Sequence, residues 1–196
     1  MACNPDRCSA SSYEIEVMKP AQVLILPGWQ SSGPTHWQSL WCAQFGYQWV
    51  EQHDWMRPLR GDWIARLEEV VLATEAPLLL VAHSMGCHLV AAWAAHSRHT
   101  GRVKGALLVA PGDAERDELR PLLPSWCPPV LQTLPFPSVL VASSNDPYCS
   151  FRRACQFASA WGADLFNAGA LGHINADSEL GDWSQGHGLL QAMIES

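Results

Sequence analysis

The sequence lacks several features that would place a protein in a class at once. No apolar run approaches the roughly 20 residues that a membrane-spanning helix needs, so we expect no membrane span. Positive charge is scarce, because 12 Lys and Arg stand against 19 Asp and Glu, and the formal net charge is −7. A chain of this sign is repelled by phosphate backbones and anionic lipids, so we expect neither nucleic acid nor membrane as a partner.

Paired cysteines and metal-binding patterns are missing as well. The seven cysteines are odd in number and scattered and form no CxxC pair, which favours reduced thiols in the cytoplasm over a disulfide framework. The eight histidines show no HExxH or similar spacing, so we expect no metal and no cofactor. The first 20 residues are polar and contain no apolar signal-peptide core. We expect 1–20 to be a flexible extension and 21–196 a single domain.

Short apolar runs alternate with amphipathic segments along most of the chain. Strands are predicted at 22–26, 47–52, 78–82, 104–110, 138–142 and 163–168. Helices are predicted at 36–45, about 62–74, 89–95 and 150–161, with one more at the C-terminus. Thr35 and Asp62 are the expected N-caps of the first two helices. The alternation predicts a three-layer α/β domain with a parallel sheet, whose ligands bind beyond the carboxyl ends of the strands.

One stretch carries a chemical pattern, Ala82-His83-Ser84-Met85-Gly86. It resembles the G-x-S-x-G nucleophile elbow, with alanine in the place of the first glycine. A wholly apolar run precedes it and an alanine-rich segment follows, which is the strand-turn-helix context that the motif requires. The alternative is an ordinary strand-to-helix turn in which Gly86 serves only packing.

A serine nucleophile needs a base and a group that orients the base. Hydrolases of this architecture carry these groups in the order Ser, Asp or Glu, His. His173 follows the last expected strand directly and is the favoured base, whereas His187 precedes the terminal helix and is expected to be solvated. Asp146 is the favoured orienting acid and Asp113 its rival. The other histidines are interpreted as structural (His83, His88) or as surface or helix residues (His36, His53, His96, His99).

The oxyanion of such a reaction is stabilised by backbone N–H groups. The expected donors are Met85, which follows the nucleophile, and Trp29 in the first loop, with Gln30 as an alternative. The rings of Trp29 and Trp55 are candidate walls of an acyl pocket. Seven prolines fall in 111–137, which is either a small cap over the site or a surface crossover that does not touch substrate.

Taken together, these motifs resemble the small α/β-hydrolase family that includes retinoblastoma-binding protein 9 and many bacterial relatives. The resemblance covers about residues 20–190 and is carried by Leu26-Pro27-Gly28-Trp29, His36-Trp37, Asp54-Trp55, the elbow through Cys87, Asn145-Asp146-Pro147-Tyr148, Trp161-Gly162-Ala163 and Gly172-His173-Ile174-Asn175-Ala176. It implies a minimal three-layer α/β-hydrolase fold of about six mostly parallel strands. It also implies a triad of Ser84, Asp146 and His173.

The sequence therefore predicts a serine hydrolase that acts on small acyl esters through an acyl-enzyme, with amides and thioesters open as substrates. The alternative is a binding module that keeps the fold without catalysis, and a protein partner cannot be read from the sequence.

Overall fold

The computed structural model describes residues 21–75 and 77–196, so the expected extension at 1–20 lies outside the described residues. Within the described part, six parallel strands form one sheet in the order β2-β1-β3-β4-β5-β6. The strands are β1 (Gln22–Leu26), β2 (Gln48–Trp49), β3 (Leu78–His83), β4 (Val103–Val109), β5 (Ser138–Ala142) and β6 (Asp164–Asn167). The α/β architecture with a parallel sheet is as predicted.

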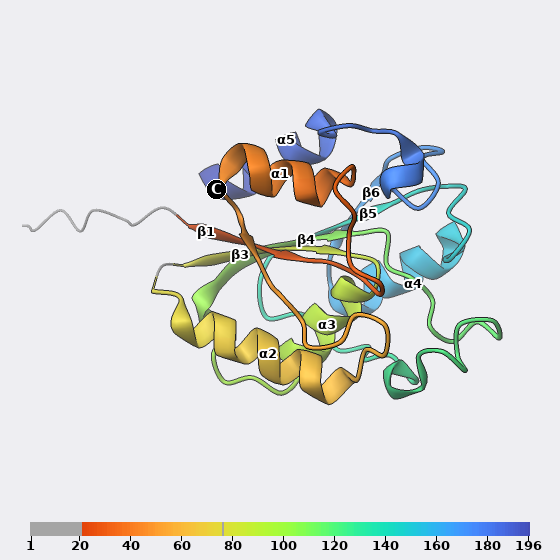
Figure 1. Cartoon of the computed structure of the whole chain (residues 1–196), viewed down its shortest axis with the longest axis horizontal. Helices are drawn as coiled ribbons and strands as arrows, with labels where there is room; N and C mark the ends of the chain where they lie inside the picture. Colours follow the sequence, from red (N-terminus) through yellow and green to blue (C-terminus); the bar gives the residue numbers. More distant parts are fainter. Residues whose placement is uncertain (1–20, 76) are drawn as a thin grey trace, which may run out of the picture.

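Helices cover both faces of this sheet (Figure 1). They are α1 (Trp37–Phe45), α2 (Arg60–Ala73), α3 (Met85–Ala94), α4 (Phe151–Trp161) and α5 (Ser184–Glu195). In Figure 1, α1 and α5 lie above the sheet, and α2 and α3 lie below it. Short 3-10 turns are also present at Thr100–Arg102, Pro124–Trp126 and Ala176–Ser178.

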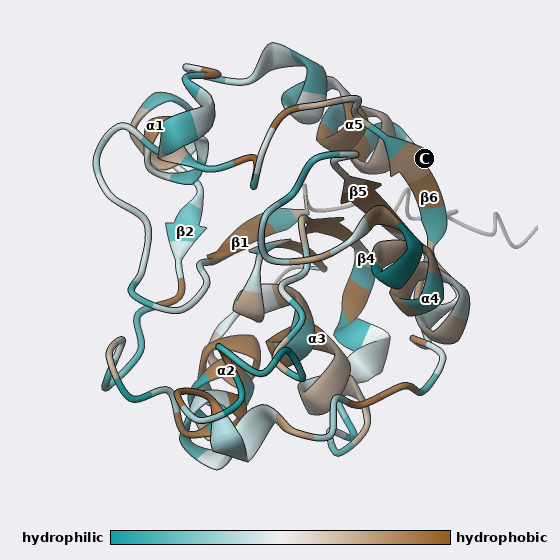
Figure 2. Ribbon diagram, turned by 90° about the vertical axis from the view of Figure 1, so that its right-hand side faces the viewer, coloured by the Kyte–Doolittle hydropathy of each residue, from teal (hydrophilic) through white to brown (hydrophobic). Residues whose placement is uncertain are grey.

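The core divides into two layers because successive strand residues point to opposite faces of a sheet. In β1, Leu24 and Leu26 belong to the core layer between the sheet and helices α2, α3 and α4. Val23 and Ile25 belong to the core layer between the sheet and helices α1 and α5. β3 is buried along its whole length, and β4 is buried except at Lys104, which explains the apolar runs Leu78–Ala82 and Ala106–Val109. Figure 2 shows that strands β1 and β5 are hydrophobic, whereas the edge strand β2 is hydrophilic.

Several predicted boundaries and caps were wrong. β2 spans two residues, not the predicted 47–52. His36, not Thr35, is the N-cap of α1, because its side chain accepts a hydrogen bond from the N–H of Gln38. α2 begins at Arg60, so Asp62 lies in its first turn and does not cap it. An acidic side chain is favourable both at the N-cap and in the first turn, since at each position it lies near the positive end of the helix dipole.

Candidate active site

Ser84 stands at a sharp turn between β3 and α3. Its backbone has φ 54° and ψ −118°, a conformation that non-glycine residues rarely adopt. The turn is tight because α3 packs closely on β1: a Cβ on Gly86 would lie 2.3 Å from the carbonyl oxygen of Leu26. The N–H of Ser84 donates to the carbonyl of Val109 in β4, at 2.9 Å. The turn therefore lifts the serine side chain out of the carboxyl edge of the sheet, and backbone strain is stored at this site.

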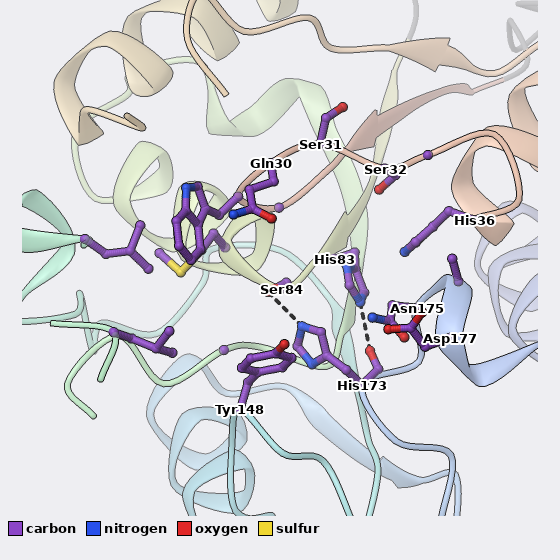
Figure 3. Close-up of a pocket in the computed structure, with 18 residues that line it drawn as sticks. Gln30, Ser31, Ser32, His36, His83, Ser84, Tyr148, His173, Asn175 and Asp177 are labelled. Atoms are coloured by element: carbon purple, nitrogen blue, oxygen red, sulfur yellow. Dashed lines mark hydrogen bonds between the residues drawn. The ribbon is translucent and has the colours of Figure 1, made fainter. Parts of the chain in front are cut away.

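The structure brings Ser84, His173 and Asp146 together in a chain of hydrogen bonds. Ser84 Oγ lies 3.0 Å from His173 Nε2 (Figure 3). On the other side of the ring, His173 Nδ1 donates to the Asp146 carboxylate, at 2.8 Å to Oδ2 and 3.0 Å to Oδ1. The Asp146 side chain is only 3% exposed and that of His173 8%, so water competes little for these contacts.

Asn145 ties together the two loops that carry the acid and the histidine. Its Oδ1 accepts from the N–H of Gly172 at 2.7 Å and from Ser143 Oγ at 2.9 Å. Asp146 Oδ1 also accepts from the N–H of Tyr148, at 2.8 Å. Sequence reasoning missed the role of Asn145, although its place beside Asp146 after a buried strand was a usable signal.

His83 supports the histidine from below, in agreement with the structural role predicted for it. Its Nε2 donates to the carbonyl oxygen of His173 at 2.9 Å, and the two rings meet edge-on at 4.8 Å. Burial lowers the pKa of His83 well below its usual value, so the ring is neutral at physiological pH.

The rival residues are engaged elsewhere. Asp113 pairs with Arg153, at 3.4 Å. His187 bonds to the hydroxyl of Tyr47 at 2.9 Å and stacks on Phe45, so the expectation that it is solvated was wrong. His36 was interpreted as a surface or helix residue; it is buried at the N-cap of α1, so the surface alternative was wrong.

Two backbone N–H groups near Ser84 are free to receive an oxyanion. Met85 is the first residue of α3, so its N–H has no partner within the helix. No residue in the described part of the chain accepts from the N–H of Trp29. The alternative, Gln30, donates its N–H to the carbonyl of Trp55 at 3.0 Å, which removes it as a donor. Gly28 permits the first loop to lie close to the turn at Ser84, since a Cβ on residue 28 would lie 3.2 Å from Met85 N.

A cavity of about 400 Å³ opens over Ser84. Leu119 and Leu123, from the proline-rich segment 111–137, line it, which supports the cap interpretation over a remote crossover. Trp29 also lines the cavity, whereas Trp55 packs edge-on against Trp63 at 5.4 Å. Trp55 is not among the residues that line this cavity.

Burial raises the pKa of the Cys149 thiol to about 12 and that of Cys42 to about 11, so neither thiol is activated. No group of three or more His, Cys, Asp or Glu in residues 21–75 and 77–196 could hold a metal ion. In the same ranges, no helix is long and apolar enough to cross a membrane.

Comparison with known proteins adds independent evidence. The family model described as serine hydrolase matches residues 23–192. A search of curated proteins finds no significant match. Among solved structures, a putative YdeN-like hydrolase from Pectobacterium atrosepticum is 29% identical with a TM-score of 0.79, covering 90% of this chain and 91% of that one.

Two more distant structures share the fold. The ydeN gene product of B. subtilis is 19% identical, with a TM-score of 0.73, over 90% of this chain and 100% of that one. Thermogutta terrifontis esterase 2 is 18% identical, with a TM-score of 0.63, over 91% of this chain and 84% of that one. The six-stranded sheet is thus that of a minimal α/β-hydrolase. The match of the serine hydrolase family model to residues 23–192 shows that this chain belongs to the serine hydrolase family.

Proposed function

We propose that the protein hydrolyses small acyl esters through an acyl-enzyme on Ser84, with His173 as base and Asp146 as the orienting acid. The observation that carries the proposal is the continuous pair of hydrogen bonds from Ser84 Oγ through His173 to Asp146, at 3.0 and 2.8 Å. No other arrangement at the carboxyl edge of the sheet joins a hydroxyl, an imidazole and a buried carboxylate among the described residues.

The chemistry follows from the direction of these bonds. His173 Nε2 takes the proton of Ser84 as Oγ bonds to the ester carbonyl carbon. His173 then gives this proton to the leaving oxygen as the carbon–oxygen bond breaks, and the alcohol departs. Water repeats the sequence on the acyl-enzyme, which releases the acid and restores Ser84. Asp146 holds the imidazole in the tautomer with a bare Nε2 and stabilises the cation that forms.

Met85 and Trp29 are the proposed oxyanion donors. The negative charge that develops on the carbonyl oxygen would lie at the N-terminus of α3, where free N–H groups and the helix dipole stabilise it. Removing one such donor costs a factor of about 10² to 10³ in rate in enzymes of this kind.

The size of the cavity favours small substrates. About 400 Å³ is near the lower end for ligand pockets, and Leu119 and Leu123 bound it from the side of 111–137. Structures of the Thermogutta terrifontis esterase with propionate or butyrate bound make short acyl chains the first choice for assay. Amides and thioesters remain secondary candidates.

We also propose that 21–196 acts as one domain. The free cysteines of the described part support a reducing compartment such as the cytoplasm.

The test is hydrolysis of p-nitrophenyl acetate, butyrate and octanoate by the wild type and by Ser84→Ala, Asp146→Asn and His173→Ala. We expect turnover of the two short esters that falls at least about 10³-fold in each variant. A folded wild type with no turnover of any ester would overturn the proposal and favour the binding module. Turnover that survives Ser84→Ala would place the chemistry elsewhere.

A further inference from the structure

The cavity over Ser84 has a lining of two kinds. Its apolar side chains include Trp29, Met85, Leu119 and Leu123. Its polar side chains include Ser32, His36, Asn175 and Asp177, which together form a polar end. Figure 3 shows the second group gathered beyond His83 and His173, with the His36 ring directed toward it from the start of α1. An ester has two arms of different chemistry, so this contrast predicts which arm lies against the polar end.

His36 brings a buried polar atom to the polar end without a partner for it. Its Nδ1 accepts from the N–H of Gln38 at 3.1 Å, which fixes the neutral tautomer with the proton on Nε2. Burial, together with the nearby His173, lowers the pKa of His36 to about 4, so the ring is neutral at pH 7. His36 Nε2 is buried and has no hydrogen-bond partner among the described residues. Because an unpaired buried donor costs free energy, this N–H favours a ligand that brings an acceptor.

The reaction assigns the polar end to the leaving group. The general acid has to reach the leaving oxygen, so the alcohol lies on the His173 side of Ser84. Asn175 and Asp177 follow His173 in the chain, and the His36 ring packs on His83, at 4.8 Å between ring centroids. The apolar side chains of the lining are then left for the acyl chain.

The charges at the polar end select among alcohols. An anionic group would meet the carboxylate of Asp177 and a neutral imidazole, which gives it no counter-charge. A cationic group would suit Asp177 but would leave the N–H of His36 facing another donor. A hydroxyl satisfies both, because it accepts from His36 and donates to a carboxylate.

We propose, on the basis of the function proposed above, that the polar end is a leaving-group subsite for a diol or polyol. The preferred substrates are then esters of a small apolar acid in which the alcohol keeps a free hydroxyl. In the bound state, this hydroxyl accepts from His36 Nε2 and donates toward Asp177.

The test compares glycerol monobutyrate with propyl butyrate, which has the same acyl chain and the same three-carbon alcohol without the free hydroxyls. The wild type should show a kcat/KM at least about tenfold higher for the glycerol ester, because the propyl ester leaves the buried Nε2–H of His36 unpaired. His36→Asn should bring this ratio to within about threefold of one. Asparagine is itself a good N-cap, so the substitution keeps the start of α1 while removing the donor.

Two further variants make the result specific. Asp177→Ala, at an exposed position, should also lower the ratio of kcat/KM for the glycerol ester to that for the propyl ester. This variant tests the subsite if His36→Asn does not fold. His53→Asn makes the same exchange at an exposed histidine outside the cavity and should keep the wild-type ratio. Equal hydrolysis of both esters by the wild type, or an unchanged ratio in the His36 and Asp177 variants, would overturn the subsite while leaving the esterase intact. Failure of the wild type on both butyrates and on p-nitrophenyl butyrate would instead overturn the proposed function and the subsite with it.

Discussion

Gly28 is the residue at which one methyl group should do the most damage to the proposed reaction. A Cβ at this position would lie 2.8 Å from Ser84 Cβ and 3.2 Å from Met85 N. Carbon atoms in contact prefer about 3.5 to 4.0 Å, so the first loop or the elbow has to retreat by about 0.7 Å or more. The loop carries the N–H of Trp29, and the elbow carries the nucleophile. Misplacement of a reacting group by about 1 Å can cost 10²-fold in rate, so we predict that Gly28→Ala lowers kcat by about 10²-fold.

The assay is steady-state hydrolysis of p-nitrophenyl butyrate, with urea unfolding of the same preparation to establish that the variant is folded at the assay temperature. Gly61→Ala is the matched control, because a Cβ at Gly61 meets no atom within 4 Å and the residue lies outside the cavity. Its kcat should equal that of the wild type. A folded Gly28→Ala variant with kcat within threefold of the wild type would refute the reasoning that this loop must touch the elbow for catalysis.

Three further predictions concern stability and rate. Gly86→Ala should lower the free energy of unfolding by about 2 kcal/mol or more in urea titrations, because its Cβ would lie 2.3 Å from a backbone oxygen in β1. Burial lowers the pKa of His88 to about 4, so below about pH 6.5 the unfolded chain binds a proton that the folded chain does not. The contribution of neutral His88 to the free energy of unfolding is full above pH 6.5 and declines toward pH 4 by about 1.4 kcal/mol per pH unit. The urea midpoint of His88→Asn should therefore fall less steeply with decreasing pH than that of the wild type. Asp146→Asn should lower kcat by about 10⁴-fold with little change in KM, because the amide stabilises the wrong imidazole tautomer; a loss below tenfold would contradict its role.

The parallel sheet could be predicted from the sequence because its signal is local. Five buried residues after Pro77 have no polar member to mark a face, which is typical of a strand covered on both sides. β2 was predicted too long, since this edge strand forms only two register pairs with β1, although the N–H of the following Val50 still donates to Ile25 of β1 at 2.9 Å. The starts of α1 and α2 were misplaced by one or two residues because a side-chain cap depends on geometry that the residue type does not fix. α3 begins at Met85, four residues before the predicted start at Leu89.

The candidate site could be predicted where chain order limits the choice. The order of Ser84, Asp146 and His173 and their places after strands were readable, and the side chains do lie within hydrogen-bond distance. His36 was not recognised because its importance comes from burial beside His83, which no local pattern reports. The choice between Trp29 and Gln30 depended on a single long-range bond from the Gln30 N–H to Trp55.

The most direct test of the central claim is labelling of the purified protein with a fluorophosphonate, followed by intact mass and peptide mapping. An activated serine displaces fluoride from phosphorus and gains one phosphonyl group. We predict a single adduct on Ser84 in the wild type, none in Ser84→Ala, and strongly slowed labelling in His173→Ala. A folded wild type that stays unlabelled, or an adduct on another residue, would contradict the account.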